Sequence, residues 1–225
     1  MKKSLPAHRR GKFIVIDGGD GSGKTTLVKF VKDIFPDIVT TREPGGSPFA
    51  EKIREVVLSQ DAKDADANTQ FGLFWASRAD HIKNTVVPAL SSGKNVISDR
   101  MDSSSYAYQI HGQQNKHLKE LFFEVRKVYL SKWKPDLYIF LDVKPEEGAR
   151  RQALQRKHDL NHFDKRALDF HRRVRTGLLE FLKSVPHVII DANQPLEKVK
   201  EDFVKVLNKT LKLKNAKTKD KKTSA

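Results

Sequence analysis

The chain has 225 residues, no cysteine and a formal net charge of +15. This length is enough for one α/β domain with a sizeable core, and the absence of cysteine excludes disulfides, thiolate metal sites and thiol nucleophiles. No apolar run reaches the ~18 residues of a membrane span, and Met1-Lys2-Lys3 leads into polar and basic residues rather than a signal-peptide core. We therefore expect a soluble, cytoplasmic protein that does not contact a membrane.

The positive charge gathers in three segments. Residues 1–12 carry +5, residues 150–175 carry +6 and residues 205–225 carry +7, so the remainder is net negative. We expect residues 1–11 to be a basic extension, residues 12–211 to form one domain and residues 212–225 to be a disordered tail. Weak nucleic-acid binding by the terminal charges is the alternative, but we do not expect it to be the main function.

The stretch Gly18–Thr25 fits the pattern G-x-x-x-x-G-K-[ST] of a phosphate-binding loop (P-loop). It lies between an apolar run, residues 13–17, and apolar residues at helical spacing, residues 27–34, which is the strand–loop–helix order that this loop requires. Lys24 is predicted to bridge the outer phosphates and Thr25 to hold Mg²⁺. The predicted triphosphate-binding residues are Gly18, Gly19, Asp20, Gly21, Ser22, Gly23, Lys24, Thr25 and Thr26.

A second short strand, residues 38–41, runs into Arg42-Glu43-Pro44-Gly45-Gly46. Because this strand ends at the same sheet edge as the P-loop, Arg42 is a candidate to grip a second phosphate; a surface arginine in a Pro-Gly turn is the alternative. A helix follows Ser47, which we predict as its cap, with Phe49, Ile53, Val56 and Val57 on its apolar face.

A long helix is predicted over residues 68–90, with Phe74 and Arg78 one turn apart on one face. This pair could stack on a base and hydrogen-bond its edge, although an aromatic residue in such a stripe is more often part of the core. The strand at residues 95–98 delivers Asp99-Arg100 to the ligand edge of a parallel sheet. Asp99 is a candidate Mg²⁺ ligand and Arg100 a candidate to neutralise phosphate charge; a helix cap beside a surface arginine is the alternative.

Polar side chains suited to the rim of a small-molecule pocket follow at Asp102–Gln109. Beyond them we predict helices at residues 118–133, 163–183 and 195–211 and strands at residues 137–141 and 187–190. The basic segment between, about 148–164, is either a solvated helix face or a mobile lid that brings arginines over the phosphates. The order of elements predicts a three-layer, doubly wound α/β fold of the P-loop NTPase type with about five parallel strands.

Taken together, these motifs resemble the thymidylate kinases, a family of P-loop nucleoside monophosphate kinases. The matching stretches are 13–26, Thr41–Gly46, Phe74–His81, Asp99-Arg100 with Ser104 and Ala107-Tyr108-Gln109, Leu141–Glu147 and Ile190–Ala192. The resemblance covers about residues 12–207. It implies Mg²⁺-dependent transfer of the ATP γ-phosphoryl group to dTMP, and a homodimer formed through helices such as those around residues 71–87 and 118–129.

The resemblance also implies roles for individual residues. Asp20 would contact the sugar 3′-hydroxyl and Mg²⁺, and Arg42 and Arg100 would hold the acceptor phosphate. Phe74 would stack on thymine and Arg78 would hydrogen-bond its carbonyl edge. The substrate pocket would be completed by Glu43, Ser104, Ser105, Tyr108 and Gln109.

Some members of this family carry an arginine inside the P-loop, where this chain has Gly21. The catalytic arginine is therefore expected from the lid, with Arg151 and Arg156 as candidates. The stretch Asn161–Asp164 departs from the family pattern, and Met101 stands where an aromatic residue is common. The alternative functions are a kinase for another nucleoside monophosphate or a deoxynucleoside, and an NTPase stimulated by nucleic acid.

Overall fold

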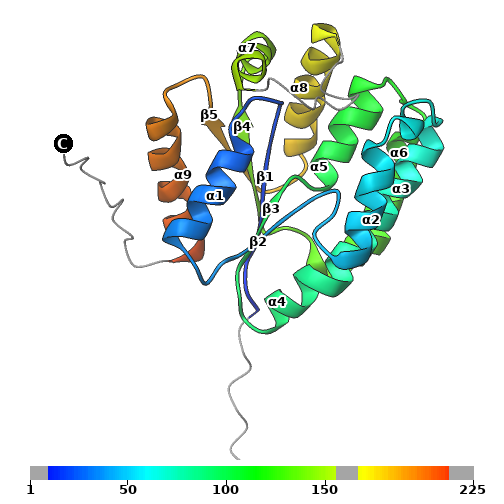
Figure 1. Ribbon diagram of the computed structural model, residues 1–225. Helices are drawn as coiled ribbons and strands as arrows, with labels where there is room; N and C mark the ends of the chain where they lie inside the picture. The colour runs from blue at the N-terminus through cyan, green and yellow to red at the C-terminus, as the bar shows by residue number, and fades with distance from the viewer. Residues whose placement is uncertain (1–9, 156–166, 213–225) are drawn as a thin grey trace, which may run out of the picture.

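A computed structural model describes residues 10–155 and 167–212. Its centre is a five-stranded sheet in the order β2-β3-β1-β4-β5, in which all neighbouring strands are parallel (Figure 1). The strands are β1 (Phe13–Gly18), β2 (Val39–Arg42), β3 (Val96–Asp99), β4 (Leu137–Asp142) and β5 (His187–Asp191). The predicted α/β fold is confirmed, with β2 and β3 each lying one residue later than predicted.

The central strand β1 is buried along its whole length because helices cover both faces of the sheet. Successive side chains of a strand point to opposite faces, so Phe13 and Val15 join one hydrophobic cluster while Ile14 and Ile16 join the other. A strand buried on both sides needs the continuous apolar run by which this one is recognisable in the sequence.

Two helices cover the face of Ile14 and Ile16, namely α1 (Lys24–Ile34) and α9 (Leu196–Leu211) (Figure 1). The opposite face carries more helices and the larger cluster. These helices are α2 (Pro48–Leu58), α3 (Ala67–His81), α4 (Val87–Ser91), α5 (Asp102–Ser105), α6 (Leu118–Leu130) and α8 (Leu168–Leu182). The short 3₁₀ turns are η1 (Asp61–Lys63) and η4 (Ser131–Trp133).

The predicted long helix over residues 68–90 is one rod in which a π-helical turn, η2 (Ile82–Val86), joins α3 to α4. A second π-helical segment, η3 (Tyr106–Gly112), continues α5 and carries Tyr108 and Gln109. It packs closely on α8, where a Cβ at Gly177 would meet the ring of His111 at 2.8 Å. π-Helical turns are frequent at functional sites, and η3 lies beside the P-loop.

The prediction for α2 is wrong in two respects. Val57 is buried, but Phe49 is 60% exposed and Val56 53% exposed, so the core of this chain covers only part of the apolar face expected from the helical period. Ser47 does occupy the N-cap position, but its hydroxyl donates to Asp80 in α3 instead of accepting a hydrogen bond from the helix backbone. Tertiary contacts override the local capping preference here.

The basic segment begins inside a helix, α7 (Pro145–Gln155), and residues 156–166 lie outside the described part of the chain. The predicted helix from residue 163 begins at Leu168 in the described part. Residues 1–9 and 213–225 are also outside it. No helix among the described residues is long and apolar enough to span a membrane.

Candidate active site

The P-loop connects β1 to the first turn of α1. Gly23, at the N-cap of α1, has φ +91°, a backbone conformation that only glycine adopts readily. The chain can therefore turn sharply enough to present backbone N–H groups at the start of the helix, where the helix dipole also favours anions. The predicted strand, loop and helix are all present at the predicted positions.

Lys24 is folded back onto this loop. Its ammonium group donates to the carbonyl oxygens of Gly18 and Gly19 at 3.0 and 2.8 Å and to the hydroxyl of Ser22 at 3.2 Å. Burial and the nearby Arg100 lower the pKa of Lys24 to about 8. An incoming phosphate would offer this ammonium group a charged partner in place of carbonyl oxygens.

Arg100 stands at the centre of the ionic network beyond the strand ends. It follows β3 with φ +68°, which is uncommon outside glycine. Its guanidinium group donates to Asp20 at 2.6 Å and to Asp17 at 3.4 Å, and lies 5.0 Å from the ring centre of Tyr108. Burial would lower the pKa of Arg100, but Tyr108 and the two carboxylates raise it above its ordinary value. The group is therefore a permanent cation.

The pKa values of the two carboxylates in this network, Asp17 and Asp20, are shifted in opposite directions. Burial raises the pKa of Asp17 despite its contacts with Arg100 and Ser103. For Asp20, burial acts in the same direction, but Arg100 and Lys24 outweigh it and hold the pKa below its ordinary value. Asp20 is therefore ionised, and its Oδ1 accepts from both Arg100 and the Tyr108 hydroxyl at 3.0 Å.

The predicted metal ligands lie side by side at the start of α1 and the end of β3. The Thr25 hydroxyl donates to Asp99 Oδ2 at 3.3 Å. The other carboxylate oxygen, Oδ1, is buried and has no hydrogen-bond partner among the described residues. Mg²⁺ bound to a nucleotide needs only one or two protein oxygens besides phosphate and water, so a hydroxyl beside an unpaired carboxylate oxygen fits this ion. The described residues contain no cluster of three or more acidic, histidine or cysteine ligands.

A cavity of about 570 Å³ opens beside the P-loop and runs between the sheet edge, α2, α3 and η3. It brings together most of the predicted site residues. Those that line it are Asp20, Gly21, Gly23, Lys24, Thr25, Thr26, Arg42, Glu43, Phe74, Arg78, Asp99, Arg100, Ser104, Ser105, Tyr108 and Gln109. Gly18, Gly19, Ser22 and Arg151 do not line it, and Arg156 lies outside the described residues.

The part of the cavity lined by α3 and η3 holds buried polar atoms that have no partner among the described residues. Arg78 is 2% exposed and donates to Glu43 at 2.8 Å and to Ser105 at 2.9 Å, while its Nη1 has no partner in the described part of the chain. The same holds for both amide atoms of Gln109. Buried polar groups are nearly always paired. Arg78 Nη1, the Gln109 amide and the ring of Phe74 together suit a flat ligand that has hydrogen-bonding groups along its edge.

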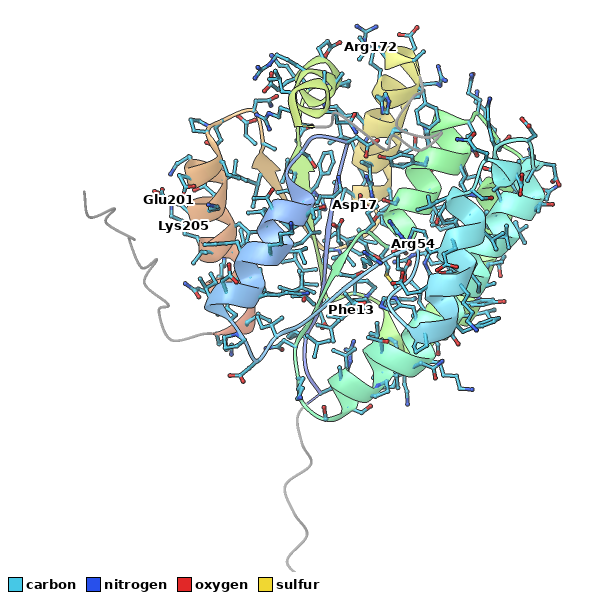
Figure 2. All side chains as sticks on the ribbon, viewed as in Figure 1. Phe13, Asp17, Arg54, Arg172, Glu201 and Lys205 are labelled. Atoms are coloured by element: carbon cyan, nitrogen blue, oxygen red, sulfur yellow. The ribbon has the colours of Figure 1, made fainter. Side chains whose placement is uncertain are left out.

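Arg42 and Arg54 also line the cavity. Arg42 is exposed and forms a two-pronged pair with Glu51 at 2.8 and 3.3 Å. Arg54 donates to the Pro44 carbonyl at 2.8 Å, and burial together with the like charge of Arg42 lowers its pKa. Figure 2 shows Arg54 pointing from α2 toward the sheet and Asp17 at the carboxyl end of β1.

The helix α7 lies directly on the P-loop. A Cβ at Gly21 would meet the Gly148 carbonyl oxygen at 2.3 Å, and a Cβ at Gly148 would meet the Asp20 carbonyl oxygen at 2.3 Å. Arg151 donates to the carbonyls of Ala192 at 2.8 Å and Gly21 at 3.5 Å and pairs with Glu147 at 2.6 Å. In this arrangement Arg151 fastens α7 to the backbone around the P-loop.

Sequence reasoning missed several residues of this site. Arg54, Lys29, Leu58, Met101, Pro44 and Gln152 also line the cavity. His171, in α8, places Nδ1 at 3.7 Å from Asp20 Oδ2. Asp17, Pro44 and Met101 carried a usable signal, since each lies at or just beyond the end of a strand at the ligand edge. The others reach the site from helices whose packing the sequence does not specify: Lys29, Arg54, Leu58, Gln152 and His171.

Comparison with known proteins agrees with this geometry. The family model for thymidylate kinase matches residues 16–203. Thymidylate kinases of Clostridium novyi (strain NT) and Marinomonas sp. (strain MWYL1) are each 39% identical to the chain, over 199 and 206 residues, which cover 86% and 89% of this chain and 96% and 95% of theirs. That of Limosilactobacillus reuteri (strain DSM 20016) is 38% identical over 200 residues, covering 85% and 93%. With a P-loop, an arginine-rich cavity and near full-length similarity, the chain belongs to the thymidylate kinase family.

Proposed function

We propose that this chain transfers the γ-phosphoryl group of ATP to dTMP, giving ADP and dTDP. The observation that carries the proposal is the single cavity that joins Lys24 of the P-loop to the unpaired Arg78 Nη1 and Gln109 amide. One end suits the triphosphate of the donor and the other suits a pyrimidine, with Arg42, Arg54 and Arg100 between them. Membership of the thymidylate kinase family supports the same reaction.

At the donor end, we assign the phosphates of ATP to the backbone of Gly18–Thr26 and to Lys24. Thr25 and Asp99 would hold Mg²⁺, for which the unpaired Asp99 Oδ1 is the supporting observation. When bound, Mg²⁺ neutralises charge that develops on the phosphate oxygens. The protein groups contribute by fixing the donor in line with the acceptor and excluding water.

At the acceptor end, Phe74 would stack on thymine, with Arg78, Ser105 and Gln109 at its polar edge. Asp20, Ser104 and Tyr108 would face the sugar. Arg42 and Arg100 would hold the acceptor phosphate, and Arg54, which lines the same part of the cavity, is a third cation for it. The permanent charge of Arg100 then compensates the equatorial oxygens during transfer.

We propose a homodimer as the assembled state. The predicted interface helices leave Leu121, Val128 and Tyr129 of α6 exposed at 48, 71 and 42%. Val56 of α2 and Phe123 of α6 are exposed as well. A second copy of this chain would cover such apolar side chains. We also retain the cytoplasm as the proposed compartment.

The choice of acceptor is the first test. A coupled assay of ADP release with dTMP, dUMP, dGMP, UMP and thymidine should show the highest kcat/KM with dTMP, because the cavity offers cations for an acceptor phosphate and hydrogen bonds for a pyrimidine edge. Preference for unphosphorylated thymidine would contradict the role of Arg42. ATP hydrolysis stimulated by DNA or RNA, and lost when residues 212–225 are removed, would favour the nucleic-acid alternative.

The lid arginines are the second test. Arg151→Ala and Arg156→Ala should lower kcat more than they weaken dTMP binding, because a lid group acts on the transferred phosphoryl rather than on the base. Arg150→Ala is the matched control, since Arg150 is 63% exposed on the same helix and pairs only with Glu147 among the described residues. An unchanged kcat in both test variants would move the catalytic arginine elsewhere.

A further inference from the structure

The loop after β2 is fastened to one face of α3 and η2 by polar side chains. The Gly45 N–H donates to Ser77 Oγ at 3.0 Å, and the Thr85 hydroxyl donates to the Gly46 carbonyl at 2.6 Å. The approach is close, because a Cβ at Gly46 would meet Thr41 Oγ1 at 2.5 Å and His81 Cδ2 at 2.6 Å. The loop and the helix therefore form one packed unit.

A buried chain of hydrogen bonds runs through this unit. The Nδ1–H of His81 donates to Glu43 Oε1 at 2.9 Å, and His81 Nε2 lies 2.8 Å from Thr41 Oγ1. The other carboxylate oxygen, Glu43 Oε2, accepts from Arg78 Nε at 2.8 Å. His81 is fully buried and Glu43 is 5% exposed. Burial raises the pKa of Glu43, but Arg78 and His81 outweigh it and keep the pKa below its ordinary value, so the carboxylate is ionised.

The geometry of the Glu43–Arg78 pair is unusual for a buried arginine and carboxylate. Such pairs commonly form two parallel N–H···O bonds. Here Glu43 Oε1 accepts from His81 and only Oε2 faces Arg78, which gives Glu43 its Nε alone. Its Nη2 turns to Ser105 at 2.9 Å, and its Nη1 stays without a protein partner among the described residues. The guanidinium group is also held 4.4 Å from the ring centre of Trp75.

We propose that His81 is a positioning residue for base recognition. By donating to Glu43 Oε1 it fixes the rotation of the carboxylate so that only Oε2 faces Arg78. Arg78 Nη2 is then left to bond Ser105, and Nη1 is left to bond the ligand in the cavity. Thr41 fixes the imidazole from the other side. The inference rests on the proposed function, in which this end of the cavity receives the thymine of dTMP.

The test compares substitutions that keep or remove the donor to Glu43. His81→Leu removes it at similar volume and should raise the KM for dTMP about tenfold, the usual effect of losing a hydrogen bond to a charged group, while kcat and the KM for ATP stay within about twofold. His81→Asn places an amide nitrogen where Nδ1 stands and should restore most of the loss. In proton NMR of the wild type, the buried Nδ1–H should give a downfield resonance that His81→Leu lacks.

Two further variants separate this role from simple loosening of the loop. Thr85→Val removes the contact with the Gly46 carbonyl but leaves Glu43 untouched, so the KM for dTMP should not change. Arg78→Lys keeps a cation beside Glu43 but cannot bond both Ser105 and the base. It should raise the KM for dTMP by itself, and adding His81→Leu to it should raise the KM no further.

The outcomes separate the inference from the proposed function. An unchanged KM for dTMP in Arg78→Lys would overturn the assignment of the base site and the inference with it. If the KM for dTMP rises in Arg78→Lys but is unchanged in His81→Leu, the inference alone is overturned. Equal rises in the KM for dTMP in His81→Leu and Thr85→Val would also overturn the inference alone. If His81→Leu does not fold, Thr41→Val replaces it with an expected rise of a few-fold, and an unchanged KM there also overturns the inference.

Discussion

Replacing Lys24 with methionine should lower kcat about 10³-fold, which corresponds to about 4 kcal/mol of transition-state stabilisation. Methionine keeps the length and packing of the side chain but removes the only ammonium group that contacts the P-loop carbonyls in the described structure. A charge that bridges the outer phosphates of ATP contributes most as those phosphates separate. Steady-state kinetics of dTDP formation gives the measurement.

The pH dependence of ATP affinity distinguishes loss of the Lys24 charge from damage to the P-loop. Because the pKa of Lys24 is about 8 in the free protein and phosphate binding favours the charged form, the complex holds the proton more tightly than the free protein. ATP affinity of the wild type should therefore fall as pH rises through about 8, by at most about tenfold per pH unit, and Lys24→Met should not show this fall. Lys32→Met, on the exposed side of α1, should behave as wild type. A near-normal kcat in Lys24→Met would remove Lys24 from the mechanism.

Replacing Arg100 with alanine should have a comparable effect, a loss of about 10³-fold in kcat, in the range found for arginines that stabilise a transferring phosphoryl group. Arg100→Lys should recover only part of this activity, since an ammonium group keeps the charge but cannot donate in the fork that now reaches Asp17, Asp20 and Ser104. Binding of dTMP, followed by calorimetry, should weaken in both variants.

Stability has to be followed in the same experiment, because Arg100 also neutralises the carboxylates of Asp17, which is buried, and Asp20, which is partly buried. Thermal unfolding of the Arg100 variants should report any loss of structure, and Arg100→Lys, which retains a cation beside Asp17 and Asp20, is the variant on which the conclusion depends. Arg10→Ala is a matched control: Arg10 is half-exposed and pairs with Asp136 at the opposite, amino-terminal edge of the sheet. Wild-type turnover in Arg100→Ala would contradict the role assigned to it.

The residues that the sequence alone could place are those at strand ends. The P-loop, Arg42 and Asp99-Arg100 each follow a predicted strand, and in a parallel sheet the carboxyl ends of all strands lie at one edge. Phe74 is a harder case, because its spacing is that of a core residue. In the structure it packs against the larger hydrophobic cluster and also lines the cavity. Phe74 therefore packs on the core and also borders the cavity, and periodicity could not have distinguished these two positions.

The remaining features depend on contacts between segments far apart in the chain. His81 meets Glu43 across 38 residues and Arg151 meets the carbonyl of Gly21 across 130, so no local pattern encodes either contact. Phe49 and Val56 show a limit of local patterns, which identify an apolar surface but not what covers it. Their helical period correctly identifies an apolar surface, but it does not say whether the core of the same chain covers that surface, and here it does not.

The contact between Gly21 and Gly148 limits how this enzyme could change in evolution. A side chain at either position would run into the backbone of the other segment, and Gly21 also has a positive φ, +73°. An arginine could therefore enter the P-loop only if α7 first withdrew, which would displace the helix that carries Arg151. In this chain an arginine at position 21 and the present position of α7 are sterically exclusive, so such a change would need coordinated substitutions in both segments.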